Sequence, residues 1–201
     1  MTGLVEARRD AEQIVRLLQP ACERLAVAGS LRRECDRVRD LDLVLVPKLL
    51  PTPGRLFDDG ELVPALDDLL ARTIAHRNAG LTRPRDAKNG PRHKELRYGR
   101  RKVELWIVLP PATWGVIFAL RTGPADFSRL LVTAECYGGA MPVDHRVTAG
   151  RLMHAGRQVP TAEESDFFRA LDLPTLPPRE RTAESLSRLL SRRNQYRTTT
   201  E

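Results

Sequence analysis

Apolar positions recur at helical spacing near the start of the chain and again further on. From Thr2 to about Leu18 they alternate with charged side chains, and Pro20 ends the run. A second run, from Asp58 to Ala75, follows a loop that is rich in proline. The spacing predicts an amphipathic helix over each run.

Strand patterns lie between and after these helices. Residues 23–28 are briefly apolar, and residues 40–46 (DLDLVLV) alternate before becoming wholly apolar. Residues 96–98 and 102–108 flank Gly99-Arg100-Arg101. This arrangement predicts two strands and then a hairpin.

The second half of the chain has shorter periodic segments. Helices are predicted over residues 112–121 and 125–136, because Thr122-Gly123-Pro124 would break a continuous one. A further helix is predicted over residues 161–171, with Thr161 and Glu164 as a capping box. Short apolar pieces lie between these helices, and an Arg-rich tail with some helical spacing follows Pro177-Pro178.

Composition limits the class of protein. The 201 residues are 41% hydrophobic and carry a formal net charge of +7, which suits one compact domain with or without a small appendage. No apolar stretch approaches the roughly 18 residues that a membrane helix needs, and charge interrupts the N-terminus before a signal sequence could form. Cys22, Cys35 and Cys136 have neither disulfide-framework nor zinc-ribbon spacing. We therefore expect a cytoplasmic protein.

Positive charge is concentrated in one segment. Between Arg72 and Lys102 there are eleven Lys or Arg residues but only two acidic ones, Asp86 and Glu95. Such a density favours contact with a phosphate backbone, although a solvated loop would also be basic.

The candidate chemistry lies in a short stretch before and within the second strand. A Gly29-Ser30 turn followed by Arg32 and Arg33 offers backbone amides, a hydroxyl and guanidinium groups to a phosphate. Asp40 and Asp42 then project from the same face of a strand, where two carboxylates need a cation such as Mg²⁺. Glu104, in an otherwise apolar strand, is a third candidate ligand.

This order of Gly-Ser, Asp-x-Asp and a later strand-borne acid resembles the nucleotidyltransferase superfamily. The second half narrows the likeness to the X-family, or polymerase-β-like, DNA polymerases, over about residues 1–182. The motifs that carry it are Trp114-Gly115, Arg121-Thr122-Gly123 with Phe127, Gly138-Gly139, residues 160–168 and residues 177–181.

The resemblance implies an α+β fold in three parts. These are a nucleotidyltransferase palm with a mixed or antiparallel sheet over residues 1–111, a small α+β thumb over 112–182 and a basic tail over 183–201. The lyase and fingers modules of larger members are not expected.

The resemblance also implies site residues. The catalytic and metal-binding residues, which would hold two Mg²⁺ or Mn²⁺ ions, are Asp40, Asp42 and Glu104. The nucleotide-binding residues are Gly29, Ser30, Arg32, Arg33, Arg39, Arg121 and Gly123. The DNA-binding residues are Lys88, Arg92, Lys94, Arg97 and Lys102.

The sequence departs from the family pattern at two places. The third acid is Glu104 rather than Asp, and Leu120-Arg121 precedes Thr122-Gly123 where aromatic residues are common. A cis peptide, common in the family after Thr-Gly, would fall at Gly123–Pro124. Trp106 is expected in the core.

These features predict a DNA-directed DNA polymerase that adds nucleotides to a primer 3′-hydroxyl, in gap-filling, repair-type synthesis. The expected partners are a nucleoside triphosphate and a DNA primer–template, with no membrane, and a monomer is favoured. Two alternatives stay open: a template-independent nucleotidyltransferase acting on a small molecule, protein or RNA end, and a catalytically silent nucleic-acid-binding module.

Overall fold

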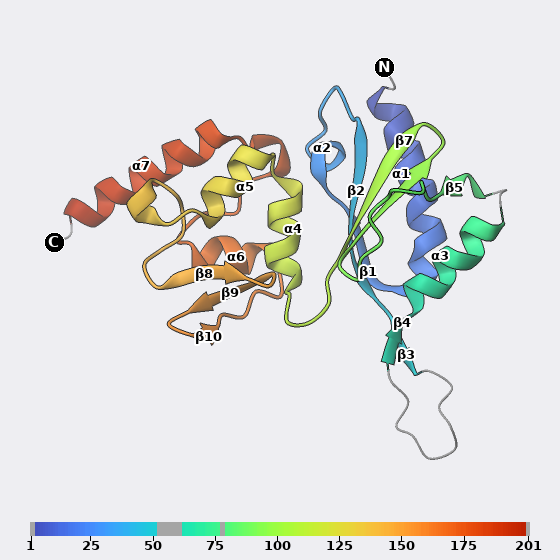
Figure 1. The fold of residues 1–201 in the computed structure, drawn as a ribbon. Helices are drawn as coiled ribbons and strands as arrows, with labels where there is room; N and C mark the ends of the chain where they lie inside the picture. Colours follow the sequence, from blue (N-terminus) through green and yellow to red (C-terminus); the bar gives the residue numbers. More distant parts are fainter. Residues whose placement is uncertain (1–2, 52–61, 77–78, 200–201) are drawn as a thin grey trace, which may run out of the picture. The chain divides into compact units, whose positions relative to one another are not determined.

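The computed structural model describes residues 3–51, 62–76 and 79–199 (Figure 1). The fold class is α+β, as predicted, and its main sheet is mixed. The chain divides into two compact units, the first formed by residues 1–27 with 36–109 and the second by residues 28–35 with 110–201. No helix in these described ranges has both the length and the apolar character needed to cross a membrane.

The first unit is built around a five-stranded sheet in the order β1-β2-β7-β6-β5, in which only the β2–β7 pair is parallel. Its strands are β1 (Cys22–Val27), β2 (Asp40–Pro47), β5 (Leu81–Thr82), β6 (His93–Tyr98) and β7 (Arg101–Ile107). A separate ribbon and three helical segments complete it: β3 (Leu49–Pro51) with β4 (Leu62–Pro64), α1 (Leu4–Leu18), the 3-10 turn η1 (Gln19–Ala21) and α3 (Ala65–Ala75).

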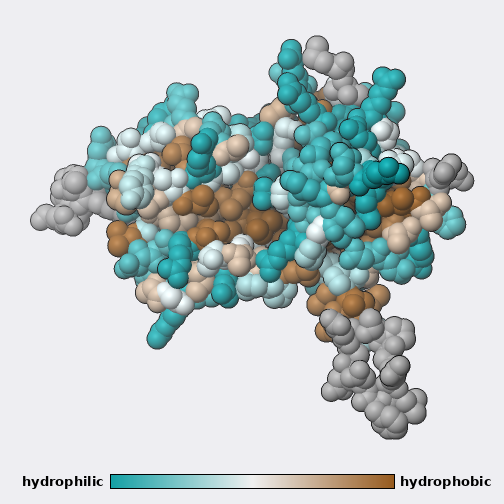
Figure 2. All heavy atoms as spheres, in the orientation of Figure 1, coloured by the Kyte–Doolittle hydropathy of each residue, from teal (hydrophilic) through white to brown (hydrophobic). Residues whose placement is uncertain are grey.

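Helix α1 runs alongside the sheet (Figure 1) and buries Ala7, Ala11, Ile14 and Leu18 along one stripe. In β7 the odd positions 101 to 107 are buried, while Lys102, Glu104 and Trp106 are only half-buried on the other face. The sheet therefore has one core face and one polar face. Figure 2 shows mostly hydrophilic residues on the visible surface of this unit, with apolar residues gathered at β3 and β4 and in a smaller area toward the right edge of the view.

The first-unit predictions for α1, β2 and the β6–β7 hairpin are confirmed. The predicted helix from Asp58 begins too early: residues 52–61 lie outside the described range, and Leu62–Pro64 form a strand instead. Pro64 disfavours helical backbone at Val63, so α3 starts only at Ala65.

The second unit packs helices around a small antiparallel sheet in the order β10-β9-β8. Its strands are β8 (His145–Thr148), β9 (Arg151–His154) and β10 (Arg157–Gln158). Its helices are α2 (Gly29–Arg32), α4 (Trp114–Thr122), α5 (Ala125–Val132), α6 (Glu164–Ala170) and α7 (Ala183–Thr199), with 3-10 turns at η3 (Glu135–Tyr137) and η4 (Pro178–Glu180).

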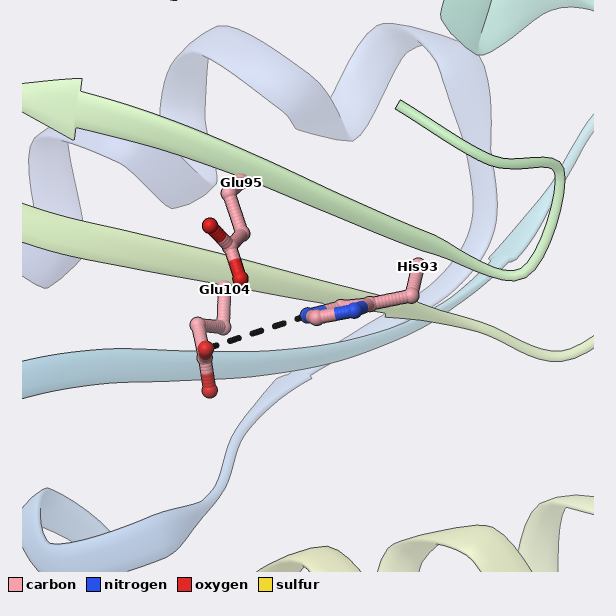
Figure 3. Close-up of side chains that lie close together, drawn as sticks. All are labelled: His93, Glu95 and Glu104. Atoms are coloured by element: carbon pink, nitrogen blue, oxygen red, sulfur yellow. Dashed lines mark ion pairs between the residues drawn. The ribbon is translucent and has the colours of Figure 1, made fainter. Parts of the chain in front are cut away.

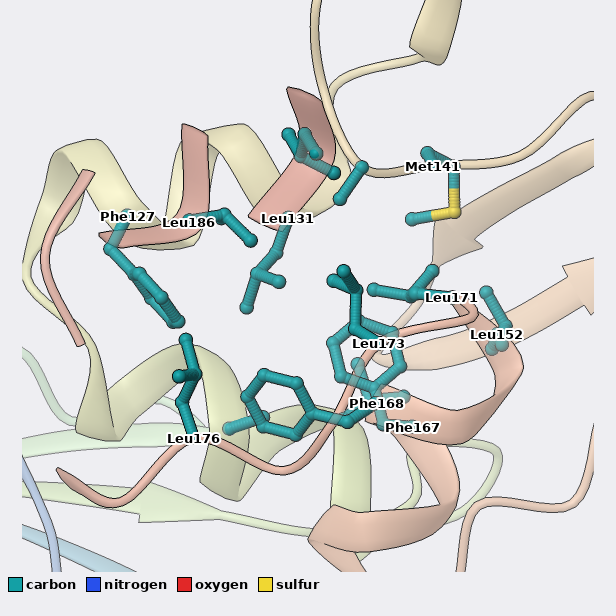
Figure 4. Packing of buried hydrophobic residues seen from close by; sticks show 14 residues of the cluster. Phe127, Leu131, Met141, Leu152, Phe167, Phe168, Leu171, Leu173, Leu176 and Leu186 are labelled. Atoms are coloured by element: carbon teal, nitrogen blue, oxygen red, sulfur yellow. The ribbon is translucent and has the colours of Figure 1, made fainter. Parts of the chain in front are cut away.

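Aromatic and aliphatic side chains from α4, α5, α6 and α7 form one core in this unit (Figure 4). Phe127, Phe167 and Phe168 are fully buried, and Leu186 and Leu190 of α7 join them. The expected division into 112–182 and a separate tail therefore differs from the structure, because the first part of the tail belongs to this core. Residues 28–35, expected in the first domain, also belong here.

Two local predictions in this unit are wrong. The capping box of α6 uses Glu163 and Asp166, because Thr161 is engaged by the Thr113 hydroxyl at 2.6 Å. The Gly123–Pro124 bond is trans, and within the described ranges the cis bond is Pro110–Pro111.

Candidate functional site

The three predicted metal ligands lie on the polar face of the main sheet. Asp40 and Asp42 occupy alternate positions of β2, and the parallel register places Asp42 opposite Glu104 of β7. Burial raises the pKa of Asp42; a hydrogen bond from Trp106 opposes this, while the negative charges of Glu104 and Asp40 add to it. The two strands thus assemble clustered carboxylates, whose mutual repulsion a cation would relieve.

Trp106 does not lie in the core as predicted. Its position in β7 has the same parity as Glu104, so the indole lies on the polar face and its Nε1 donates to Asp42 Oδ1 at 3.1 Å. The ring of His93 stacks on it with centroids 3.9 Å apart and planes 2° apart. An indole N–H needs an acceptor when it is partly buried, and Asp42 supplies one.

Glu104 lies close to the Lys102 ammonium and the His93 ring of its own unit. Lys102 Nζ lies 2.5 Å from Glu104 Oε1, and His93 Nε2 lies 3.8 Å from the same oxygen. Lys102 Nζ also lies 3.4 Å from Glu95 Oε1, and its hydrogen bond to Glu104 raises the pKa of Lys102. Lys102, which was expected to bind DNA, is therefore already paired with two carboxylates.

A second group of possible metal ligands shares Glu104 with the three predicted ones. His93, Glu95 and Glu104 have donor atoms all within 4.8 Å of one another, and it is the single such group among the described residues (Figure 3). Asp40 and Asp42 are not members of this group, although Glu104 interacts with Asp42 as well as with Lys102. The sequence analysis missed His93 and Glu95, although antiparallel pairing of β6 with β7 sets Glu95 opposite Glu104.

The donor set fits a hard divalent cation. Asp40, Asp42 and Glu104 offer carboxylate oxygens, which Mg²⁺ and Mn²⁺ prefer. The raised pKa of Asp42 shows that its ionised form lacks full compensation from the protein.

No protein-family model and no curated protein matches this chain. The assignment of the carboxylate face depends on its geometry and its donor atoms.

The predicted phosphate loop lies in the second unit. Gly29 adopts a left-handed backbone (φ 57°) that leads into α2, and Ser30 is half-buried there. Arg33 donates to the carbonyl of Thr122 at 2.6 Å. The loop is thus braced against the end of α4.

Arg32 is fully engaged inside the second unit. Its guanidinium makes two bonds of 2.9 Å to Glu164, a bond of 2.6 Å to Thr122 Oγ1, and lies 3.9 Å above the ring of Phe118. The structure thus gives this side chain an internal bracing role, and its expected contact with a nucleotide stays a prediction. No local sequence pattern reveals a partner so far along the chain.

Glu164 lies at the centre of a buried charge network. Arg181, which is 1% exposed, donates to Glu164 at 2.5 Å and also to the carbonyl of Leu176. Burial alone would raise the pKa of Glu164, but hydrogen bonds from Arg181 and Arg32 outweigh it and hold the pKa below its usual value. The network ties α2, α6 and the segment after η4 together.

The two remaining residues of the predicted nucleotide site that lie in this unit stand at the end of α4. Arg121 is exposed in the last turn. A Cβ on Gly123 would lie 2.4 Å from the Phe127 ring and 2.9 Å from Ser128 Oγ. Glycine is therefore needed there for packing.

The predicted DNA contacts are not all at the surface. Lys88, Arg92 and Arg97 are exposed, whereas Lys94 is 3% exposed and lies 2.7 Å from Asp67 Oδ1. Lys94 is therefore an internal structural cation, which corrects its expected role. Of the basic segment, Arg77 lies outside the described residues.

Arg39 lies in a different setting from the other predicted nucleotide-binding residues. It lines a cleft of about 800 Å³ in the first unit, formed by the start of α1, residues 37–39 and the β6–β7 turn. Sequence reasoning did not foresee this cleft.

Proposed function

We propose that the protein is a divalent-metal-dependent nucleotidyltransferase that extends a DNA primer, with a polymerase-type palm in its first unit and a thumb in its second. The carrying observation is the parallel register of β2 and β7, which sets Asp42 opposite Glu104 with Asp40 on the same face. Catalysis of this kind depends mainly on positioning and charge neutralisation.

The residues of the polar face have distinct roles in this proposal. Asp40, Asp42 and Glu104 hold the cations, which when bound activate a hydroxyl and neutralise phosphate charge. Trp106 fixes the orientation of Asp42 through its 3.1 Å hydrogen bond. Lys102 holds the carboxylate of Glu104 and balances its charge.

The substrate contacts are assigned to residues that can reach solvent. Ser30 and Arg33, which are half-buried, and Arg121, which is exposed, would bind the triphosphate. Lys88, Arg92 and Arg97 would contact DNA phosphates, since all three are exposed.

Primer extension tests the proposal directly. The full chain would be assayed with a labelled primer in Mg²⁺ and in Mn²⁺, with and without a template strand. We expect template-dependent extension that Asp42→Asn lowers by at least about 10²-fold. Asp86→Asn, the same change at an exposed loop residue of the same unit, is the matched control and should keep full activity.

Other outcomes assign other functions. Extension that needs no template would identify a terminal-type transferase, and extension that survives Asp42→Asn would disprove the metal assignment.

A second candidate is a catalytically silent nucleic-acid-binding module. The observation that favours it is the 2.5 Å pair between Lys102 and Glu104, which neutralises one proposed ligand. Tight DNA binding without extension in either metal, in wild type and in Lys102→Met alike, would support this candidate.

A further inference from the structure

The cleft of the first unit is lined by positive charge and lies away from the carboxylate face. Arg37, Arg39, Arg100 and Arg101 line it together with the acidic residues of α1, and its volume is about 800 Å³. Arg101 is one of the buried residues of β7, so its side chain lies on the face of the sheet opposite to that of Lys102 and Glu104. The cleft is thus at the α1 side of the sheet.

Arg101 forms a fixed part of the cleft wall. It is 6% exposed, its Nε lies 2.9 Å from Asp10 Oδ2, and it donates to the carbonyl of Val38 at 2.9 Å. The negative charge of the Asp10 carboxylate is therefore balanced by Arg101 in the cleft wall. The same contacts join α1, the segment before β2 and the β6–β7 turn into one frame.

Three arginines of the cleft remain available. Arg37, Arg39 and Arg100 are exposed, and their guanidinium groups make no hydrogen bond or ion pair to any part of the chain that the structure describes. Glu6 is the one other acidic residue in the lining. The cleft therefore carries an excess of positive charge with unused donors, on a wall held together by the Arg101 contacts.

We propose that this cleft is a phosphate-binding site that takes phosphates of a nucleic acid, separate from the carboxylate face. Guanidinium groups bind phosphate oxygens through paired donors, and three of them around one cleft match a run of phosphates better than a single small anion. The proposal rests on the proposed function only in choosing nucleic acid as the ligand, and it needs no catalysis.

A binding experiment in EDTA tests the site apart from the chemistry. Anisotropy of a short fluorescent DNA duplex would be measured with the full chain across a salt series from about 50 to 200 mM. The test variant is Arg37→Gln/Arg100→Gln. The matched control is Arg146→Gln/Arg157→Gln, which removes the same charge from two exposed residues of the second unit.

We expect the test variant to bind about tenfold more weakly and to lose roughly 1.8 from the slope of log K against log salt, the contribution of two phosphate contacts. The control should lose far less. Equal losses in both variants, or no loss in the test variant at an unchanged unfolding temperature, would overturn the proposal.

Two further arms identify the source of the phosphate. If the test variant loses equal affinity for duplexes with 5′-hydroxyl and 5′-phosphate ends, the cleft binds backbone phosphates. If it loses affinity only for duplexes with 5′-phosphate ends, the cleft binds a terminal phosphate. Displacement of the duplex from the wild type, but not from the test variant, by millimolar inorganic phosphate alone would show a small-anion site and contradict a nucleic-acid site. A failure of primer extension would leave these results unaffected, since none of these arms depends on it.

Discussion

The position of Asp42, a proposed metal ligand, is unfavourable for its charged form in the folded state. Its carboxylate is partly buried beside Glu104 and Asp40, and among the described residues the Trp106 hydrogen bond is what favours its charge. A raised pKa means that the folded state binds the proton more tightly than the unfolded state, so ionisation of Asp42 reduces stability at neutral pH.

Asp42→Asn should therefore raise the unfolding temperature at neutral pH while it removes activity. An amide oxygen still accepts from Trp106, and the uncompensated charge is gone. The increase in unfolding temperature should shrink as the pH falls through the raised pKa of Asp42 toward the ordinary aspartate pKa of about 3.9. Thermal unfolding from acidic to neutral pH in EDTA measures it, and a variant less stable than wild type at neutral pH would contradict the argument.

Glu164→Gln should have the opposite effect. It leaves Arg181 buried without its charged partner, a change that costs about 3–5 kcal/mol in such pairs. The pKa of Glu164 is lower in the folded than in the unfolded state, so its ionised form stabilises the fold. This stabilisation is fully present above the unfolded-state pKa of about 4.3 and is lost as the pH falls through the folded-state pKa. Chemical denaturation at neutral pH measures the loss; Glu184→Gln, at an exposed pair, is the control and should change little.

At the scale of elements, α4 and the segment leading into α6 approach closely at one glycine. A Cβ on Gly115 would lie 2.2 Å from the carbonyl oxygen of Glu163 and 2.7 Å from that of Thr161. The same glycine donates its N–H to Thr161 at 3.1 Å. The backbone therefore leaves no room for a side chain.

Gly115→Ala should destabilise the protein by about 1–3 kcal/mol or more, since backbone rather than a flexible side chain would have to move. Gly90→Ala, where the nearest atom would be His93 O at 3.7 Å, is the control and should be nearly neutral. Urea denaturation of both variants provides the comparison.

Local patterns predicted most elements, and they failed where distant contacts decide. Alternation located β2 and the β6–β7 hairpin, because each strand has one buried face. Trp106 lies outside the core, although it is large and apolar, because it has the same parity as Glu104 in β7. The capping box of α6 shifted because Thr161 has a partner far away in sequence.

The candidate site shows the same limit. Asp40, Asp42 and Glu104 were found from residue type and spacing, and their alignment follows from the β2–β7 register. The roles of Arg32 and Lys94 could not be predicted, because Glu164 and Asp67 reach them only through the tertiary fold.

At the scale of the whole molecule, the two units are not successive segments of the chain. Residues 28–35 leave the first unit, contribute Arg32 and Glu34 to the second, and return at Asp36. Together with the connection at Leu109 and Pro110, the chain passes between the units three times.

Separately produced halves, residues 1–109 and 110–201, should therefore bind each other when co-expressed. Residues 28–35 of one half would complete the second unit of the other through Arg32, which bonds to Glu164 and Thr122. Pull-down with a tag on either half measures this, and Arg32→Met should abolish it. Association that Arg32→Met leaves intact would show that the segment is not the main link.

The same threading limits how such a protein could have been assembled by recombination. A single crossover near Leu109 that replaced the C-terminal half would bring in a new Glu164 and Thr122 but retain the old residues 28–35. A foreign second half would then lack its matching arginine unless the donor were closely related. The two halves are consequently expected to be inherited as one block, with changes at Arg32 and Glu164 accepted only together.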